Sequence, residues 1–295
     1  MELFDRKIIV KFNPEFLKNE EEDKLGRNDV CFCGSGKKQK KCHSNVEQES
    51  YVANLYEKYF EIDNIISEYR DIHKGFENHP CGKGCYNCCY DVFSISMLEF
   101  EILLEELRNI GLEFAERIFE KSLEDLEVLR ISNPDLYNRL EEDVTLQQDA
   151  AFKDVNLYSK TERFPFSCPM LDDSKGSCLV YNKRPMICRL FGTTHDSFSL
   201  MLDSRDESLV CEHIPSAQAN VLQTPEVENS DFRINEMLET RYSGEVLLPR
   251  EYPIVYWFKV YRDKNLKKGR PVYSSLVPSF YYKKPGSITL AELMP

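Results

Sequence analysis

The spacing of cysteine residues constrains this chain more than any other feature of its sequence. Eleven cysteines occur among 295 residues, and they fall into three groups: Cys31, Cys33 and Cys42; Cys81, Cys85, Cys88 and Cys89; and Cys168, Cys178, Cys188 and Cys211. Their number is odd, and their density is below the roughly 8–10% that is typical of a disulfide scaffold. In a reducing compartment, clustered thiols without disulfide partners are most simply explained as metal ligands.

The charge balance limits the classes of partner. Fifty acidic residues against 38 basic ones give a net charge of -12, which disfavours whole-surface binding to nucleic acid or to an anionic membrane, so any such contact must be local. The N-terminus lacks a basic region followed by a long apolar stretch, and no run approaches the roughly 18 apolar residues that span a bilayer. We therefore expect a cytoplasmic protein without membrane or DNA contacts.

The first cysteine group ends in a histidine and has the pattern C-x-C-x8-C-H, formed by Cys31, Cys33, Cys42 and His43. Three thiolates and one imidazole suit tetrahedral zinc, and the glycines between them let the chain fold back. Residues 34–37, Gly-Ser-Gly-Lys, are not a phosphate-binding loop, because Cys31 replaces its first glycine and Lys38 its final Ser or Thr. The pattern predicts a zinc knuckle.

Residues 26–45 resemble the SEC-C motif, including its Cys-Gly-Ser-Gly-Lys-Lys core at 33–38. The resemblance implies a small zinc module found at the C-terminus of the secretion motor SecA and in many bacterial proteins. It also implies contact with the chaperone SecB or with the ribosome. The zinc-loaded module would carry a charge of about +3, which suits an acidic partner or an RNA backbone. Alternatively, its lysines only solvate the knuckle.

The remaining eight cysteines occur in two blocks. Adjacent residues such as Cys88 and Cys89 project in different directions, so one ion would rarely take all four ligands of the first block. We therefore expect sites built from both blocks. Eight thiols are enough for two iron–sulfur clusters, or for one cluster and one zinc ion. The alternative is that all eight are buried, inert thiols.

Residues 76–213 are similar to the YkgJ-type cysteine cluster family, which is named for a C-x-x-C-x-x-C-C core and described as zinc- or iron-chelating. Both blocks carry the likeness, including the phrase Gly-x-Cys-x-x-Tyr-x-x-Arg-Pro-x-x-Cys-Arg at Gly176–Arg189. The first gap has three residues, 82–84, rather than two, and Cys211 lies outside the matching phrases. Arg184 and Arg189 either hydrogen-bond to cluster sulfurs or pair with carboxylates.

Helical periodicity dominates the middle of the chain. Apolar spacing predicts a helix over Tyr51–His73, and Ser96 with Glu99 forms a capping box that opens another, which Gly111 ends. We expect a second helix to Ile131 and a third that begins near Pro134. Residues 97–143 carry a net charge of -9, which predicts a solvated face or, alternatively, an acidic docking surface.

The last 50 residues differ in character. Pro253–Tyr261 and Pro271–Val277 have β-type composition, with a turn containing Asn265 and Gly269 between them. Residues 259–284 carry a net charge of +7 interleaved with aromatic residues, a pattern that would bind single-stranded RNA or a ribosomal surface. The alternative is a sheet edge protected by lysines and docked on the acidic helices.

These features predict an α+β, mainly α protein in four parts: an N-terminal arm at 1–25, the zinc knuckle at 26–45, a helical cysteine-cluster domain at 51–213 and a basic, short β-containing C-terminal region at 232–295. We expect a zinc ion in the knuckle, and iron, an iron–sulfur cluster or zinc in the larger domain. An adaptor for a chaperone or the ribosome fits best. A flagellin lysine methylase family carries a comparable cysteine cluster, so an iron-dependent protein-modifying enzyme remains an alternative, although the sequence contains no catalytic motif.

Overall fold

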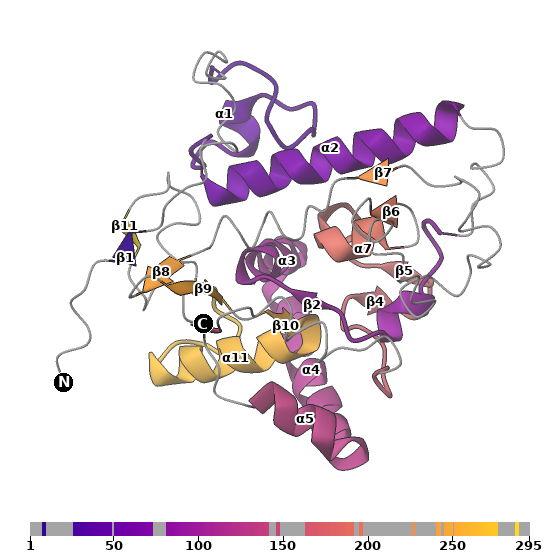
Figure 1. Cartoon of the computed structure of the whole chain (residues 1–295), viewed down its shortest axis with the longest axis vertical. Coiled ribbons are helices and arrows are strands. Elements are labelled where there is room, and N and C mark those ends of the chain that lie inside the picture. Colours follow the sequence, from indigo (N-terminus) through magenta and orange to yellow (C-terminus); the bar gives the residue numbers. More distant parts are fainter. Residues whose placement is uncertain are drawn as a thin grey trace.

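A computed structural model describes residues 26–48, 50–72, 81–141, 163–191 and 251–276, together with several short strands outside these ranges. The described helices are α1 (Gln39–Cys42), α2 (Tyr51–Ile72), α3 (Met97–Ile110), α4 (Leu112–Ser132), α5 (Pro134–Glu141), α7 (Met186–Leu190) and α11 (Ile254–Lys267), and the 3-10 helices are η3 (Asn87–Tyr90) and η4 (Tyr181–Lys183). The predicted class, α+β and mainly α, is confirmed (Figure 1). No described helix is both long enough and apolar enough to cross a bilayer.

The strands are short and make small sheets. β2 (Ser94–Ile95) pairs with β10 (Tyr252–Pro253), and β4 (Leu171–Asp172) pairs with β5 (Ser177–Cys178), both antiparallel. The other strands are β1 (Ile8–Ile9) with β11 (Ser287–Ile288), β3 (Leu146–Gln147) with β9 (Glu245–Pro249) and β8 (Thr240–Tyr242), and the parallel pair β6 (His195–Asp196) with β7 (Glu226–Val227).

Local sequence signals place the starts of the central helices. The Ser96 hydroxyl accepts from the Glu99 amide at 3.3 Å, and the Glu99 carboxylate accepts from the Ser96 amide at 3.0 Å, which is the predicted capping box of α3. Gly111 separates α3 from α4, and Pro134 is the first residue of α5. These helix predictions are confirmed.

The prediction of a strand over Pro253–Tyr261 is wrong, because the chain is helical from Ile254 to Lys267. Its β-branched and aromatic residues favour strands locally, but tertiary packing outweighs that preference. Asn265 is a buried helical residue rather than part of a turn, and its side-chain amide donates to the carbonyl oxygens of Val272 and Ser274. No strand is assigned over 271–276, the described part of the second predicted run.

Aromatic side chains fix α11 onto α3 and α4. The ring of Phe100 lies 5.8 Å from that of Trp257 and 4.9 Å from those of Phe258 and Tyr261. The Trp257 indole N–H also donates to the Ile95 carbonyl at 2.9 Å. One buried core extends from Phe32 in the knuckle through α2, α3 and α4 to α11. The predicted C-terminal region therefore contributes a helix to the same core as the cysteine-rich segments.

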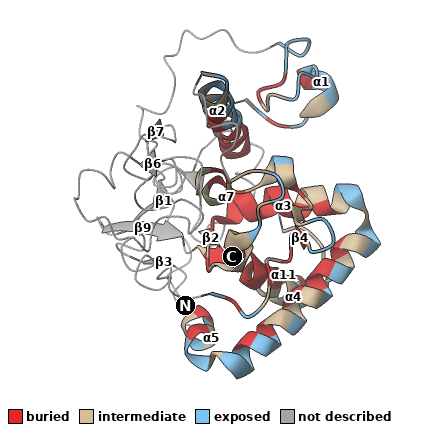
Figure 2. Cartoon of the chain, turned by 90° about the vertical axis from the view of Figure 1, so that its right-hand side faces the viewer, coloured by how far each residue is buried: buried red, intermediate tan, exposed pale blue. Residues whose placement is uncertain are grey.

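The acidic helices expose their charged face, as Figure 2 shows along α4 and α5. Lys259 of α11 forms an ion pair with Glu141 of α5 at 2.9 Å, so the start of the basic strip docks on an acidic helix. Tyr261 is 1% exposed, which excludes it as a stacking platform for a base. Residues 277–284, the end of that strip, lie outside the described residues.

Candidate metal centres

The knuckle brings its four predicted ligands together through a tight turn. The Cys31 amide donates to the Lys37 carbonyl at 2.8 Å, and Gly34 and Gly36 both have φ of 70°, a conformation that glycine adopts without strain. The one short helix α1 then carries Cys42, and His43 follows directly. The ligand atoms of Cys31, Cys33, Cys42 and His43 all lie within 4.8 Å of one another.

The geometry of these atoms fits one zinc ion. Tetrahedral zinc with Zn–S bonds of about 2.3 Å separates its sulfurs by roughly 3.8 Å. The Sγ atoms of Cys33 and Cys42 are 3.6 Å apart, and the Sγ of Cys31 is 3.2 Å from Nδ1 of His43. Burial raises the pKa of Cys33, but hydrogen bonds from His43 and Ser35 outweigh it and lower that pKa to about 5. This favours the thiolate, which is the ligand form, at Cys33, whereas burial and the neighbouring thiols Cys33 and Cys42 raise the pKa of Cys31 to about 12.

The knuckle also packs on α2 (Figure 1). Cys31 and Phe32 are buried, and the His43 ring stacks on Phe32 at 5.2 Å and contacts Tyr56 of α2 at 4.7 Å. A Cβ on Gly34 would lie 2.0 Å from the ring of Phe60, so this glycine permits a close approach to the helix.

The two later cysteine blocks meet through backbone hydrogen bonds. The Cys168 amide donates to the Cys89 carbonyl at 2.6 Å, and the Phe164 amide donates to the Tyr90 carbonyl at 2.7 Å. Asp91 and Arg163 add an ion pair at 3.0 Å. The hairpin of β4 and β5 then positions Cys178, while α7 positions Cys188.

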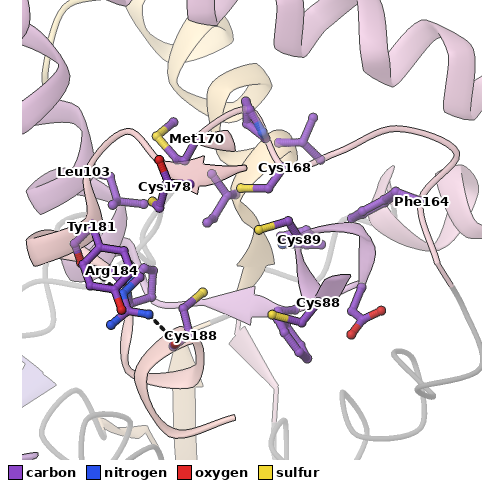
Figure 3. Close-up of a pocket in the computed structure, with 18 of the residues that line it drawn as sticks. Cys88, Cys89, Leu103, Phe164, Cys168, Met170, Cys178, Tyr181, Arg184 and Cys188 are labelled. Carbon is purple, nitrogen blue, oxygen red and sulfur yellow. Dashed lines mark hydrogen bonds between the residues drawn. The ribbon is translucent and has the colours of Figure 1, made fainter. Parts of the chain in front are cut away.

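Six cysteines from both blocks line one cavity of about 80 Å³: Cys85, Cys88, Cys89, Cys168, Cys178 and Cys188. Figure 3 shows the side chains of Cys88, Cys89, Cys168, Cys178 and Cys188 around the same space. Apolar side chains, including Phe164 and Met170, complete the wall together with Ile254 and Val255 of α11. The volume is several times the roughly 10–15 Å³ that one water needs, so the cavity has room for more than a single ion.

The cavity thiols are spaced more widely than those of the knuckle. Among the described residues, the knuckle alone brings three or more ligand atoms within 4.8 Å of one another. Burial raises the pKa of Cys168 and of Cys188, and neighbouring thiols raise both further. Six soft thiolate donors around one cavity could hold a metal centre, and the cavity has room for more than one ion.

One predicted ligand among the described residues, Cys81, does not line this cavity. The Sγ of Cys81 lies 3.6 Å from the Phe191 carbonyl and is not among the lining residues, and the gap after Cys81 is the one that departs from the C-x-x-C spacing. Cys211 lies outside the described residues.

The two arginines beside Cys188 bind oxygen atoms. Arg189 is 1% exposed in its side chain, pairs with Asp63 of α2 and donates to the carbonyls of Arg184 and Asn182. Arg184 donates to the carbonyls of Tyr181 and Cys188. Of the two roles predicted for Arg189, the structure shows pairing with a carboxylate.

Sequence reasoning missed the residues that fix α7 and the knuckle to their neighbours. Glu99 accepts a hydrogen bond at 2.7 Å from the amide of Met186, the first residue of α7, in addition to its capping role. Tyr56 and Tyr59 contact the knuckle and the second cysteine block from one helix. The apolar spacing that predicts a helix over Tyr51–His73 carries no signal for these contacts.

Comparison with known proteins identifies both metal-binding parts. Residues 27–45 match the SEC-C motif, and residues 80–212 match the CxxCxxCC family, whose description reads "Putative zinc- or iron-chelating domain". The chain therefore carries a SEC-C motif together with a cysteine-rich chelating segment, and it is a metal-binding protein.

One curated relative, the protein translocase subunit SecA of Koribacter versatilis (strain Ellin345), is 86% identical over 21 residues. That match covers 7% of this chain and 2% of the relative, so it concerns a single short segment. No solved structure matches the chain.

Proposed function

We propose that the protein binds one zinc ion in the knuckle and a polynuclear centre, an iron–sulfur cluster in the first instance, in the cysteine cavity. The observation that carries the proposal is the contrast in ligand spacing. Four knuckle ligands converge within 4.8 Å, whereas six cysteines surround a cavity without three sulfurs converging in that way. When bound, such a cluster supplies a redox couple or a rigid cross-link between the two cysteine blocks.

Anaerobic purification with elemental analysis and an absorption spectrum tests this proposal. We expect one zinc ion per chain together with several irons and sulfides, and a brown protein. The double variant Cys88→Ser/Cys89→Ser should lose the iron and keep the zinc. A colourless protein that carries only zinc in both centres would contradict the iron–sulfur assignment.

We also propose that the knuckle recruits a chaperone or the ribosome. While Phe32 and His43 pack on α2, five basic side chains of the knuckle are exposed: Arg27, Lys37, Lys38, Lys40 and Lys41. These five side chains are available to pair with acidic groups of a partner, because none of the salt bridges within the described part of the chain involves them. A cationic face of this kind suits an acidic protein or an RNA backbone.

Cosedimentation with ribosomes at low and high salt tests the ribosomal form of this proposal. We expect association that weakens steeply with salt, and that weakens at low salt in Lys37→Glu/Lys41→Glu while zinc content is unchanged. Capture of SecB instead of ribosomes would support the chaperone form. Absence of both associations at low salt would contradict the adaptor role.

The apolar side of the cavity favours a second candidate, an iron-dependent protein-modifying enzyme. Phe164, Phe166 and Met170 line the same space as the thiols, so an apolar part of a substrate would find a wall beside the metal. This candidate requires an open coordination position at the centre. Perturbation of the cluster spectrum by added cyanide would support it, whereas a centre closed by thiolates would contradict it.

A further inference from the structure

Helix α2 lies between the two proposed metal centres and contacts both. On the knuckle side, the ring of Tyr56 lies 4.7 Å from the ring of His43, the proposed fourth zinc ligand. On the cavity side, the Nζ of Lys183 lies 4.1 Å from the centre of the same tyrosine ring. Lys183 belongs to η4, which links Cys178 to the segment that carries Cys188.

One helical turn further along α2, Tyr59 makes a second set of contacts with the same cysteine block. Arg189 follows Cys188 in the sequence, and its guanidinium lies over the ring of Tyr59 at 4.3 Å. The Tyr59 hydroxyl donates to the Glu99 carboxylate at 3.3 Å, and the same carboxylate oxygen accepts from the amide of Met186 at the start of α7.

These groups are buried and mutually satisfied. Tyr56, Tyr59, Glu99 and Arg189 are each at most 5% exposed, and Arg189 is also paired with Asp63. Close-packed groups of this kind do not shift independently of one another. The position of the helix that carries Cys188 therefore depends on α2, and the position of the His43 ring depends on α2 as well.

We propose that Tyr56 is a positioning residue shared by the two metal centres, so that loading the knuckle with metal strengthens metal binding in the cysteine cavity. The inference rests on the proposed function of both sites. A metal bound to Nδ1 would fix the ring of His43. The fixed ring in turn restricts Tyr56, and with it Lys183, which lies over the Tyr56 ring. Coupling of this kind is reciprocal, and typical values begin at about fivefold in affinity.

The test is a double-mutant cycle in the full chain, with Co²⁺ under anaerobic conditions as the probe. Thiolate-bound cobalt absorbs strongly, and competition with a chelator gives the affinity of the cavity. The proteins compared are wild type, Cys33→Ser, Tyr56→Leu and the double variant, with Tyr56→Phe as the control that keeps the ring. Both single variants should weaken cavity binding by about fivefold or more, and the double variant should weaken it no further. Tyr56→Phe should match wild type.

Unchanged cavity affinity in Cys33→Ser, or effects that multiply in the double variant, would overturn the proposal. If the wild-type cavity binds no cobalt, the coupling is measured instead by alkylation of Cys188, and the iron–sulfur assignment is judged by the elemental analysis proposed above. Zinc bound in the knuckle should then slow alkylation in wild type but not in Tyr56→Leu. Equal rates with and without zinc would overturn the coupling itself.

Discussion

The knuckle and the cysteine cavity use the same donor atom but assemble it over very different distances along the chain. The four ligands of the knuckle lie between Cys31 and His43, and one turn and one short helix place them. The cavity takes its cysteines from positions between Cys85 and Cys188, and these residues meet through hydrogen bonds between separate segments.

Because of this difference, metal binding contributes differently to the folding of the two centres. A short polar segment has little apolar surface to bury, so metal binding supplies much of its folding free energy. The cavity is bounded by α11 and the two cysteine blocks, and its walls belong to the core of the larger unit. Cys31 and Phe32 of the knuckle also join this core, but the knuckle's ligand set is local, so we expect the knuckle to depend on the core less than the cavity does.

The largest effect should come from removing one cysteine that lines the cavity. Cys168→Ser should abolish the cavity metal centre, because a serine hydroxyl is a poor replacement for a soft thiolate. Cys81→Ser is the matched control: its sulfur contacts the Phe191 carbonyl outside the cavity, and it should keep the wild-type metal content. Elemental analysis of both variants makes the comparison, and loss of metal in both would place Cys81 among the ligands.

A core substitution should break the cavity and leave the knuckle intact. Phe258 is fully buried, and its ring lies 4.9 Å from Phe100 and 4.7 Å from Phe119. Phe258→Ala should cost about 3–5 kcal/mol of unfolding free energy. Leu266→Ala, at an exposed position of the same helix, should cost far less.

Chemical denaturation combined with metal analysis measures both parts of this prediction. The cavity metal should be lost at lower denaturant in Phe258→Ala, whereas knuckle zinc should remain at the wild-type level. Parallel loss of zinc from the knuckle would show that the knuckle also depends on the core.

A third, smaller effect tests how closely the knuckle depends on α2. Gly34 and Gly36 have the same φ of 70°, but an added Cβ meets the Phe60 ring at Gly34 and nothing within 4 Å at Gly36. Both alanine variants carry the backbone cost of placing a Cβ at positive φ, roughly 1–2 kcal/mol. Gly34→Ala should therefore be the more destabilising of the two, by the additional cost of moving Phe60.

These variants are compared by thermal unfolding and by zinc affinity. Adding Phe60→Ala to each should remove the difference between Gly34→Ala and Gly36→Ala. Equal losses of thermal stability and zinc affinity in the two glycine variants would mean that the knuckle does not pack on α2 in solution.

The sequence predicted local features well and long-range ones poorly. The spacing of Cys31, Cys33 and Cys42 is enough to predict a ligand set, because a turn fixes their distances. The capping pair Ser96 and Glu99 likewise depends on four consecutive residues. Helix α11 was mistaken for a strand because its aromatic residues are stabilised by α3 and α4, which no local pattern reveals.

The cavity shows the same limit. The blocks of cysteines indicate shared sites. They do not indicate that Cys81 lies outside the cavity or that α11 forms part of its wall, because both depend on contacts between distant segments. The second role of Glu99, as acceptor for the Met186 amide 87 residues away, has no sequence signature.

The smallest predicted effect concerns how α11, one wall of the cavity, is fixed to α5. Glu141 accepts from the Tyr256 hydroxyl at 2.7 Å and pairs with Lys259 at 2.9 Å. Burial raises the pKa of Glu141, but hydrogen bonds from Lys259 and Tyr256 outweigh it and leave the pKa below its usual 4.5. A lowered pKa in the folded state stabilises the protein above about pH 4.5, and this stabilisation is lost as the pH falls through the folded value.

Glu141→Gln should therefore lower the unfolding free energy at neutral pH by less than about 1 kcal/mol, because the pair is partly exposed and screened by solvent. The difference from wild type should shrink as the carboxyl protonates. Glu124→Gln, at an exposed position of α4, is the control and should show no such dependence. Urea unfolding at several pH values makes the measurement. A deficit that stays constant down to acid pH would mean that the ionised carboxylate does not fix α11, and that the cavity wall depends on apolar packing alone.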